Sequence, residues 1–219
     1  MSVKIKICCI SSLEEAKLAS KAGADVLGLV GPMPSGPGVI DNDLIAEIAK
    51  SFPTTLKTFL LTSETSAQGI IDHHKLVNTT SIQIVDELTE GNYKDIRIAL
   101  PGVELIQVIH VLDEQSIETA LTAAEQVDYL LLDSGNPNLA VKELGGTGRT
   151  HNWAISREIV EKSPVPVFLA GGLNVENVQE ALDKVKPYGL DLCSGVRSKN
   201  KLDQEKLKTF IQTAKAAKA

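Results

Sequence analysis

The chain of 219 residues lacks the features that mark several large protein classes. Its longest apolar runs have the length of a strand, far short of the ~20 consecutive apolar residues that cross a bilayer. The N-terminal segment has no apolar stretch of signal-peptide length before a small-residue cleavage site. The three cysteines are an odd number without the spacing of a disulfide framework. We therefore expect a soluble protein of the reducing cytoplasm with no membrane partner.

Basic residues and cofactor motifs are also few. The chain has 22 Lys and Arg against 28 Asp and Glu, a net charge of −6, which argues against a broad nucleic-acid interface. It has no paired cysteines and no HExxH helix, so no metal site is predicted. It also lacks a Walker-type loop and a dinucleotide fingerprint after the first predicted strand. We expect neither a metal nor an organic cofactor.

What is present is an ordinary globular composition, with 43% hydrophobic residues, arranged as a regular alternation. Short runs rich in Val, Ile and Leu have the length and composition of strands that are buried on both faces. The predicted strands cover residues 3–10, 26–30, 56–61, 82–85, 103–111, 128–133, 165–170 and 189–193.

The stretches between these runs carry helix signals. The first begins after a pair of serines, has acidic residues in its first turn and ends before Gly23, a typical capping arrangement. Asn174 and Asp203 stand where caps are expected for two later helices. The predicted helices cover residues 13–22, 43–51, 66–77, 92–99, 114–125, 153–162, 175–184 and 203–217.

Strands that alternate with helices predict parallel pairing through helical crossovers. Eight such units most simply form one (β/α)8 TIM barrel, an α/β fold, as a single domain over residues 1–219. An open doubly wound sheet is the alternative. Irregular loops follow the second strand, at residues 31–38, and the sixth strand. Both lie at the carboxyl ends of strands, where barrels carry their active sites.

Three glycine-containing segments follow the last three predicted strands. They are Gly145–Gly148, with Gly146 inside it, residues 170–174, with Gly171 and Gly172, and the pair Ser194 and Gly195. Glycine allows backbone N–H groups to approach an anion, and barrels often bind phosphate with the loops after strands seven and eight. One such segment would be read as a tight turn. Three neighbouring loops favour a phosphorylated small-molecule ligand.

The first strand places two polar groups toward the same face. In the segment 4–9, the alternation of a strand directs Lys6 and Cys8 toward the barrel axis and Cys9 outward beneath the helices. A buried cysteine is usually a small hydrophobic group. A neighbouring ammonium favours the thiolate, however, which makes Cys8 a candidate base or nucleophile, while Cys9 is interpreted as packing.

Two carboxylates lie at strand ends. Asp133 closes the sixth strand, and it either caps a turn or acts as a general acid if burial keeps its proton. Asp191 lies within the last strand and must find a partner or a substrate. Of the histidines, the pair His73 and His74 is expected to be exposed in mid-helix. His110 either faces the site or packs, and His151 is a candidate lid contact.

Several motifs occur together in a specific order along nearly the whole chain. They are Lys6-Ile-Cys8, residues 22–25, Leu131-Leu-Asp133, residues 145–150, Trp153, residues 169–174, and residues 187–191 followed by 194–196. This set resembles the phosphoribosylanthranilate isomerase family, whose members are (β/α)8 barrels of tryptophan biosynthesis.

The resemblance implies an Amadori rearrangement that needs one acid and one base and no cofactor. It implies that Cys8 is the base that removes the C2′ proton and Asp133 the acid that protonates the ring oxygen. Asp191 would contact the anthranilate amine. The further substrate-binding residues that we expect are Lys6, Gly146, Arg149, Gly171, Gly172, Ser194 and Gly195. Family members occur as monomers or homodimers, and both remain open here.

The chain departs from the family pattern around the aromatic acid. Cys9 replaces the glycine that usually follows the catalytic cysteine, and Gly38 stands where an arginine usually binds the anthranilate carboxylate. Val85 replaces the usual histidine of strand four. A true isomerase would then bind the carboxylate in another way, through Arg149 or Arg197. The alternatives are a paralogue that acts on another phosphorylated sugar or aminosugar and a non-catalytic barrel that binds a phosphorylated ligand.

Overall fold

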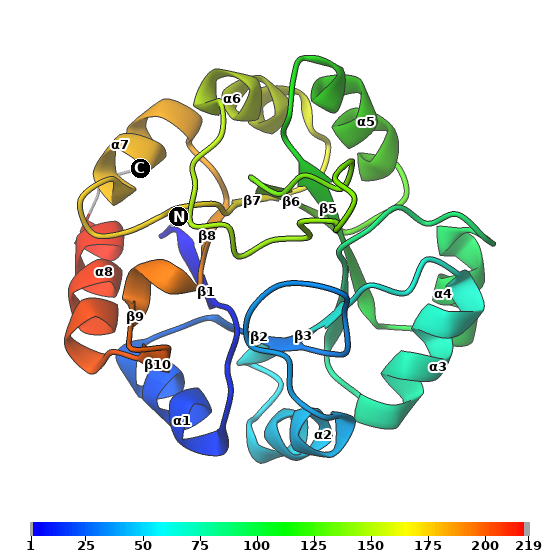
Figure 1. The fold of residues 1–219 in the computed structure, drawn as a ribbon, viewed down its shortest axis with the longest axis horizontal. Coiled ribbons are helices and arrows are strands. Elements are labelled where there is room, and N and C mark those ends of the chain that lie inside the picture. The colour runs from blue at the N-terminus through cyan, green and yellow to red at the C-terminus, as the bar shows by residue number, and fades with distance from the viewer. Residues whose placement is uncertain (1, 217–219) are drawn as a thin grey trace.

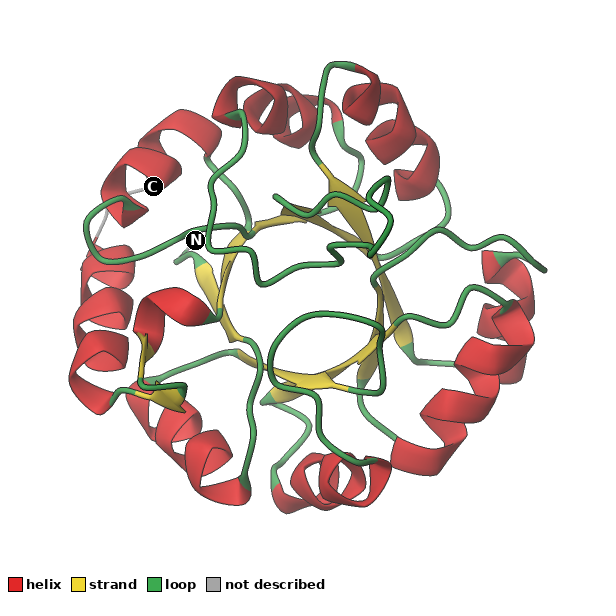
Figure 2. Ribbon diagram, in the orientation of Figure 1, coloured by secondary structure: helices red, strands yellow, loops and turns green. Residues whose placement is uncertain are grey.

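The computed structural model describes residues 2–216, and in this range the predicted strands close into one parallel barrel (Figures 1 and 2). Each strand pairs with the next along the chain, and the last pairs with the first in the register Lys6↔Asp191. The helices form a ring outside the strands. The barrel prediction is therefore confirmed, and the open doubly wound sheet is wrong.

The strands are β1 (Lys4–Ile7), β2 (Val26–Val30), β3 (Lys57–Thr62), β4 (Ser81–Ile84), β5 (Glu104–His110), β6 (Tyr129–Asp133), β7 (Val167–Leu169) and β8 (Gly189–Leu192). β2 has the predicted bounds, β3 and β4 are shifted by one residue, and the other five strands are shorter than predicted. The apolar run of β1 continues to Ile10, but the strand ends at Ile7 because Cys9 takes a left-handed backbone conformation with φ 61°.

The helices follow the predicted order. They are α1 (Leu13–Ala22), α2 (Asn42–Ser51), α3 (Ala67–Val77), α4 (Tyr93–Ala99), α5 (Gln115–Ala124), α6 (Trp153–Lys162), α7 (Val178–Val185) and α8 (Gln204–Ala216). The last predicted position of the C-terminal helix, Ala217, lies outside the described residues. None of the helices in the described range is both long and apolar enough to cross a membrane.

Local capping explains most helix ends. The Ser12 side chain accepts a hydrogen bond from the backbone N–H of Glu15 at 3.2 Å, and Gly23 ends the helix with φ 97°, as predicted. Several helices start one residue later than predicted, and α7 starts three residues later. The Asn174 side chain accepts from the backbone N–H of Asn177 and forms a turn, so α7 begins only at Val178.

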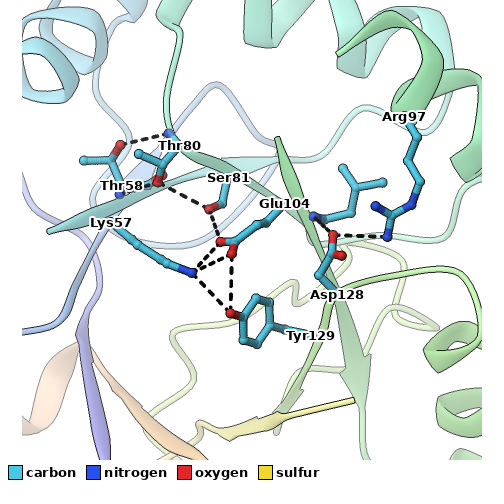
Figure 3. Close-up of polar contacts among 9 residues, drawn as sticks. Lys57, Thr58, Thr80, Ser81, Arg97, Glu104, Asp128 and Tyr129 are labelled. Carbon is cyan, nitrogen blue, oxygen red and sulfur yellow. Dashed lines mark hydrogen bonds and ion pairs between the residues drawn. The ribbon is translucent and has the colours of Figure 1, made fainter. Parts of the chain in front are cut away.

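Apolar side chains fill two layers. The larger layer lies between the strands and the helices, and a smaller one, which includes Phe59 and Phe168, fills the barrel interior. The N-terminal end of the barrel is closed by first residues of neighbouring strands: Lys57 Nζ lies 2.6 Å from Glu104 Oε1, and the Tyr129 hydroxyl lies beside both (Figure 3). Polar residues at this end serve stability, because barrel active sites lie at the opposite end.

One feature is absent from the sequence-based prediction. After β8 the chain forms the short 3-10 helix η1 (Ser194–Val196) and an antiparallel pair of two-residue strands, β9 (Arg197–Ser198) and β10 (Lys201–Leu202). Segments this short have no detectable hydrophobic periodicity. They place Arg197 beside the helix α1, where Glu15 Oε2 lies 2.9 Å from its guanidinium.

Candidate active site

A pocket opens at the carboxyl end of the barrel, and three predicted functional side chains line it from different strands. Cys8 follows β1, Asp133 ends β6 and Asp191 lies in β8. The barrel thus brings together residues that are up to 183 positions apart in the sequence (191 − 8). Of the predicted phosphate-site residues, those that also line the pocket are Gly146, Gly171, Gly172 and Ser194.

Lys6 and Asp191 form a buried ion pair beneath the pocket. The Lys6 ammonium is fully buried and lies 2.9 Å from Asp191 Oδ2, and the two residues face each other in the β1–β8 register. Burial is the largest single effect and lowers the pKa of Lys6, but the charge and hydrogen bond of Asp191, together with the nearby Cys8 and Cys9, outweigh it and raise the pKa. Burial raises the pKa of Asp191, opposed by Lys6, and the 2.9 Å contact favours the ionised pair. Among the described residues, Asp191 Oδ1 has no hydrogen-bond partner, and Asp191 lines the pocket.

Gly28 in the middle of β2 makes room for Lys6 and Cys8. A Cβ built on this glycine would lie 2.9 Å from Lys6 Nζ and 3.0 Å from Cys8 Sγ. The ammonium and the thiol therefore approach the same small space. Cys8 thus presents its thiol to the pocket beside a buried ammonium.

Asp133 lies in an environment that suits a general acid. Its side chain is 7% exposed, and Oδ1 accepts a hydrogen bond from the backbone N–H of Ser134 at 2.8 Å. Burial raises the pKa of this carboxyl above its ordinary value, although the Ser134 N–H opposes the shift. The acid thus retains its proton to a higher pH than an exposed aspartate.

The loops after β6, β7 and β8 pack closely because several positions have no side chain. A Cβ on Gly172 would lie 2.7 Å from the Arg149 carbonyl carbon, and one on Gly195 would overlap the carbonyl of Leu173. Gly171 and Gly172 have φ values of 83° and 63°, which favour glycine. These loops and the N-terminus of η1 form the kind of backbone cradle in which barrels bind phosphate.

The loop after β2 meets the loop after β6 over the mouth of the barrel (Figure 1). The Ser35 hydroxyl, in the loop after β2, donates a hydrogen bond to the Lys142 carbonyl in the loop after β6. Gly146 packs directly on Pro37. Lys142 also spans to the end of β4, where its ammonium lies 2.5 Å from Asp86 Oδ2.

Two predictions for individual residues are wrong. Cys9 does not lie beneath the helices: its left-handed backbone turns the side chain inward, where it lines the pocket with its Sγ 2.7 Å from Cys193 Sγ. His73 and His74 are not exposed. His73 bonds to Thr62 Oγ1 at 2.9 Å, and His74 Nε2 bonds to the Thr79 carbonyl at 2.8 Å, because this helix face packs on the barrel.

The other two histidines do not line the pocket. His110 Nε2 lies 3.1 Å from the Val85 carbonyl, so its packing role is the one observed. His151 Nε2 lies 2.7 Å from the Ser156 hydroxyl at the start of α6, and burial lowers its pKa to about 4. Among residues 2–216, no group of three or more His, Cys, Asp and Glu side chains is arranged to hold a metal ion.

Comparison with known proteins gives one consistent result. Residues 5–213 match the sequence profile of the N-(5′-phosphoribosyl)anthranilate (PRA) isomerase family. The chain belongs to this family. It is 34% identical to N-(5′-phosphoribosyl)anthranilate isomerase 2 of Methanosarcina mazei, over 97% of this chain and 94% of that protein. It is 32% identical to the isomerase of Methanocella arvoryzae, over 98% and 99% of the two chains.

Solved structures of PRA isomerases have the same fold. The crystal structure of the Thermotoga maritima isomerase superposes with a TM-score of 0.80 at 28% identity, covering 98% of this chain and 99% of that chain. A PRA isomerase in complex with reduced 1-(o-carboxyphenylamino)-1-deoxyribulose 5-phosphate superposes with a TM-score of 0.78 at 26% identity, with the same coverage.

The structure shows whether another cation replaces the arginine that is missing at position 38. No lysine or arginine in the described range lines the pocket. The Arg149 guanidinium turns outward to Glu143, and the Arg197 guanidinium binds Glu15 and the Cys9 carbonyl. Neither arginine therefore replaces the missing cation at position 38 in this conformation, and Lys6 lies behind Asp191.

Two residues of the site escaped the sequence analysis. Gly28, which packs against Lys6 and Cys8, is a glycine inside an apolar strand, a signal that commonly marks a close approach of another group. Gln83 in β4 is 3% exposed and lines the pocket, and its Oε1 has no hydrogen-bond partner among the described residues. A buried unpaired amide oxygen is costly, so it marks a position where a ligand is expected to donate a hydrogen bond.

Proposed function

We propose that this protein is an N-(5′-phosphoribosyl)anthranilate isomerase that carries out the Amadori rearrangement of tryptophan biosynthesis. Cys8 and Asp133, a thiol beside a buried ammonium and a carboxyl with a raised pKa, line one pocket next to a backbone cradle suited to phosphate. This pairing carries the proposal, together with the membership of the family.

Each residue then has a defined role in the proton transfers. Asp133 donates its proton to the ring oxygen of the ribose, and the furanose opens to an iminium. The Cys8 thiolate, beside the Lys6 ammonium, takes the proton from C2′, and the resulting enolamine converts to the 1-deoxyribulose 5-phosphate product. Asp191 Oδ1, the free oxygen of the ion pair, accepts a hydrogen bond from the anthranilate amine. Because the acid and the base lie on different strands, each can transfer its proton while the other stays in place.

The phosphate is assigned to the cradle formed by Gly171, Gly172, Ser194 and Gly195, with Gly146 closing the opposite side. Arg149 faces outward and pairs with Glu143, so it binds the substrate only after its guanidinium leaves Glu143. The proposal includes a cytoplasmic protein, a single barrel domain over residues 1–219, and a monomer or homodimer.

One observation favours a second candidate function. The pocket has no lysine or arginine to pair with the anthranilate carboxylate. A phosphorylated sugar or aminosugar without a carboxylate would need no such cation. This candidate keeps the same acid, base and phosphate cradle.

The deciding experiment follows the fluorescence of phosphoribosylanthranilate after addition of the purified protein. We expect turnover, and we expect Cys8→Ala and Asp133→Asn each to lower kcat by at least about a hundredfold, the usual contribution of one acid or base. Turnover that survives both substitutions would overturn the assigned roles. No turnover at saturating substrate would overturn the isomerase and favour the second candidate.

A further inference from the structure

Cys9 and Cys193 form a thiol pair on the wall of the pocket, next to the catalytic machinery but outside it. They lie at the ends of β1 and β8, the two strands whose pairing closes the barrel. Their sulfur atoms are 2.7 Å apart although the residues are 184 positions apart in the sequence. The backbone N–H of Cys8 donates to the Leu192 carbonyl at 2.7 Å and holds the two strand ends together.

We propose that Cys9 and Cys193 are an oxidation site that forms an intramolecular disulfide across the β1–β8 seam when it meets a hydroperoxide. The sulfur atoms need to move only a small distance to reach the ~2.04 Å of a disulfide bond. Because the pair bridges neighbouring strands that are already hydrogen-bonded, the bond requires little change in the backbone. The inference does not depend on the proposed isomerase activity.

The two thiols differ in exposure and in the direction of their pKa shifts, as an attacking and a resolving thiol should. Cys193 is half-buried and faces the pocket, through which a small oxidant reaches it. Contact with Cys9 lowers the pKa of the Cys193 thiol, and the Arg197 guanidinium acts in the same direction. Hydrogen bonding to Cys193 and Cys8, together with burial, raises the pKa of Cys9. Cys193 is therefore the attacking thiolate and Cys9 the resolving thiol.

The reaction has two balanced steps. The Cys193 thiolate attacks one oxygen of the hydroperoxide, so that an S–O bond forms, the O–O bond breaks and hydroxide (or an alkoxide) leaves. Cys9 then attacks the sulfenic sulfur, so that the S–S bond forms, the S–O bond breaks and water leaves with the Cys9 proton. Two thiols are oxidised, and one hydroperoxide is reduced.

The bond would close the barrel covalently. A disulfide stabilises a protein more when the loop that it closes is longer, and this one would join residues 184 positions apart. We expect the oxidised protein to have a Tm several degrees above that of the reduced protein, and we expect dithiothreitol to reverse the change.

The test treats the purified protein with stoichiometric hydrogen peroxide, blocks remaining thiols and maps tryptic peptides without reduction. Cleavage after Lys6, Lys17, Lys184 and Arg197 gives peptides 7–17 and 185–197, because the Lys186–Pro187 bond resists trypsin. We expect these two peptides to be linked, lighter together by two hydrogen atoms, and the protein to remain a single chain on a non-reducing gel.

Three variants identify the partners. Cys8→Ala keeps the linked peptides, whereas Cys9→Ser and Cys193→Ser each remove both the link and the rise in Tm. A link that disappears in Cys8→Ala would place the bond on Cys8 and overturn the proposal. So would a disulfide-linked dimer, or a wild-type map in which cysteines carry added oxygen and no linked peptide forms. Fragment ions of the linked wild-type peptides separate Cys8 from Cys9, so poor folding of a variant does not leave the question open.

Discussion

Gly38 and Cys9 exclude each other's side chains. A Cβ built on Gly38 would lie 2.5 Å from Cys9 Cβ and 2.9 Å from Cys9 Cα, and Gly38 has a φ of 81°. Where related chains combine a glycine after the catalytic cysteine with an arginine in the loop after β2, this chain has the larger residue at the first position and glycine at the second. The two departures from the family pattern are thus linked, because the Cys9 side chain occupies the space that a side chain at position 38 would need.

This relationship predicts the outcome of restoring the arginine. Gly38→Arg alone should disturb the end of β1 and lower activity, because the new side chain meets Cys9. The double variant Cys9→Gly/Gly38→Arg should bind phosphoribosylanthranilate about tenfold more tightly than the wild type, through a charge-assisted bond to the carboxylate. Steady-state KM values for the wild type, both single variants and the double variant test this. Equal KM values for Gly38→Arg and the double variant would contradict it.

Asp133→Asn should separate activity from stability. The folded-state pKa of Asp133 is raised above its ordinary 3.8, so the buried carboxylate destabilises the fold once pH rises past that value. Asparagine removes this charge and can still accept from the Ser134 N–H. We expect the inactive variant to have a higher free energy of unfolding than the wild type at pH 8, with a gain that shrinks toward pH 4. Urea unfolding at both pH values measures it, and a constant difference would contradict the assignment to ionisation.

Gly28→Ala should impair the site by overpacking. The new methyl group would lie within 3.0 Å of Lys6 Nζ, Cys8 Cα and Cys8 Sγ, and the Cys8 backbone cannot move freely. We expect a loss of about 1–3 kcal/mol in stability and a lower kcat. Gly102→Ala is the control for kcat, because a Cβ there meets nothing within 4 Å; its φ of 85° strains alanine, so the stability of Gly28→Ala is compared with the wild type. A kcat for Gly28→Ala equal to that of the control would show that Cys8 tolerates the displacement.

Gln83→Leu should stabilise the free protein and weaken substrate binding. Leucine has a similar size and removes a buried amide oxygen that has no partner, which relieves roughly 1 kcal/mol or more. If the substrate satisfies this oxygen, kcat/KM should fall about tenfold, and Gln83→Asn should give an intermediate value. Thermal unfolding and initial rates decide it: a stability gain with unchanged kcat/KM would remove Gln83 from the substrate site.

We expect the burial of His151 to make the protein less stable in mild acid. Its pKa falls from 6.5 to about 4 on folding because burial disfavours the imidazolium. A depressed folded-state pKa gives stability that is complete above pH 6.5 and is lost as pH falls toward 4. The loss amounts to at most about 3 kcal/mol. The unfolding free energy of His151→Gln should depend less on pH than that of the wild type between pH 7 and 4, and equal slopes would contradict the interpretation.

Local patterns in the sequence determined the order of the elements and the type of fold. Apolar runs such as 26–30 and caps such as Ser12 and Gly23 are signals within a few residues, and they predict β2 and α1 without any knowledge of their neighbours. The same holds for the placement of Cys8 and Asp133 at the carboxyl ends of strands, since strand alternation and the parallel arrangement decide it.

The tertiary structure alone decided which distant groups meet. The left-handed backbone at Cys9 breaks the alternation that predicted an outward side chain, and only the β1–β8 pairing brings this thiol to Cys193. The pairing of Arg149 with Glu143, and of Arg197 with Glu15, depends on loops whose paths no local pattern encodes. The Cys9–Cys193 and Arg197–Glu15 contacts arise from closing the barrel, which places residues from opposite ends of the chain within bonding distance.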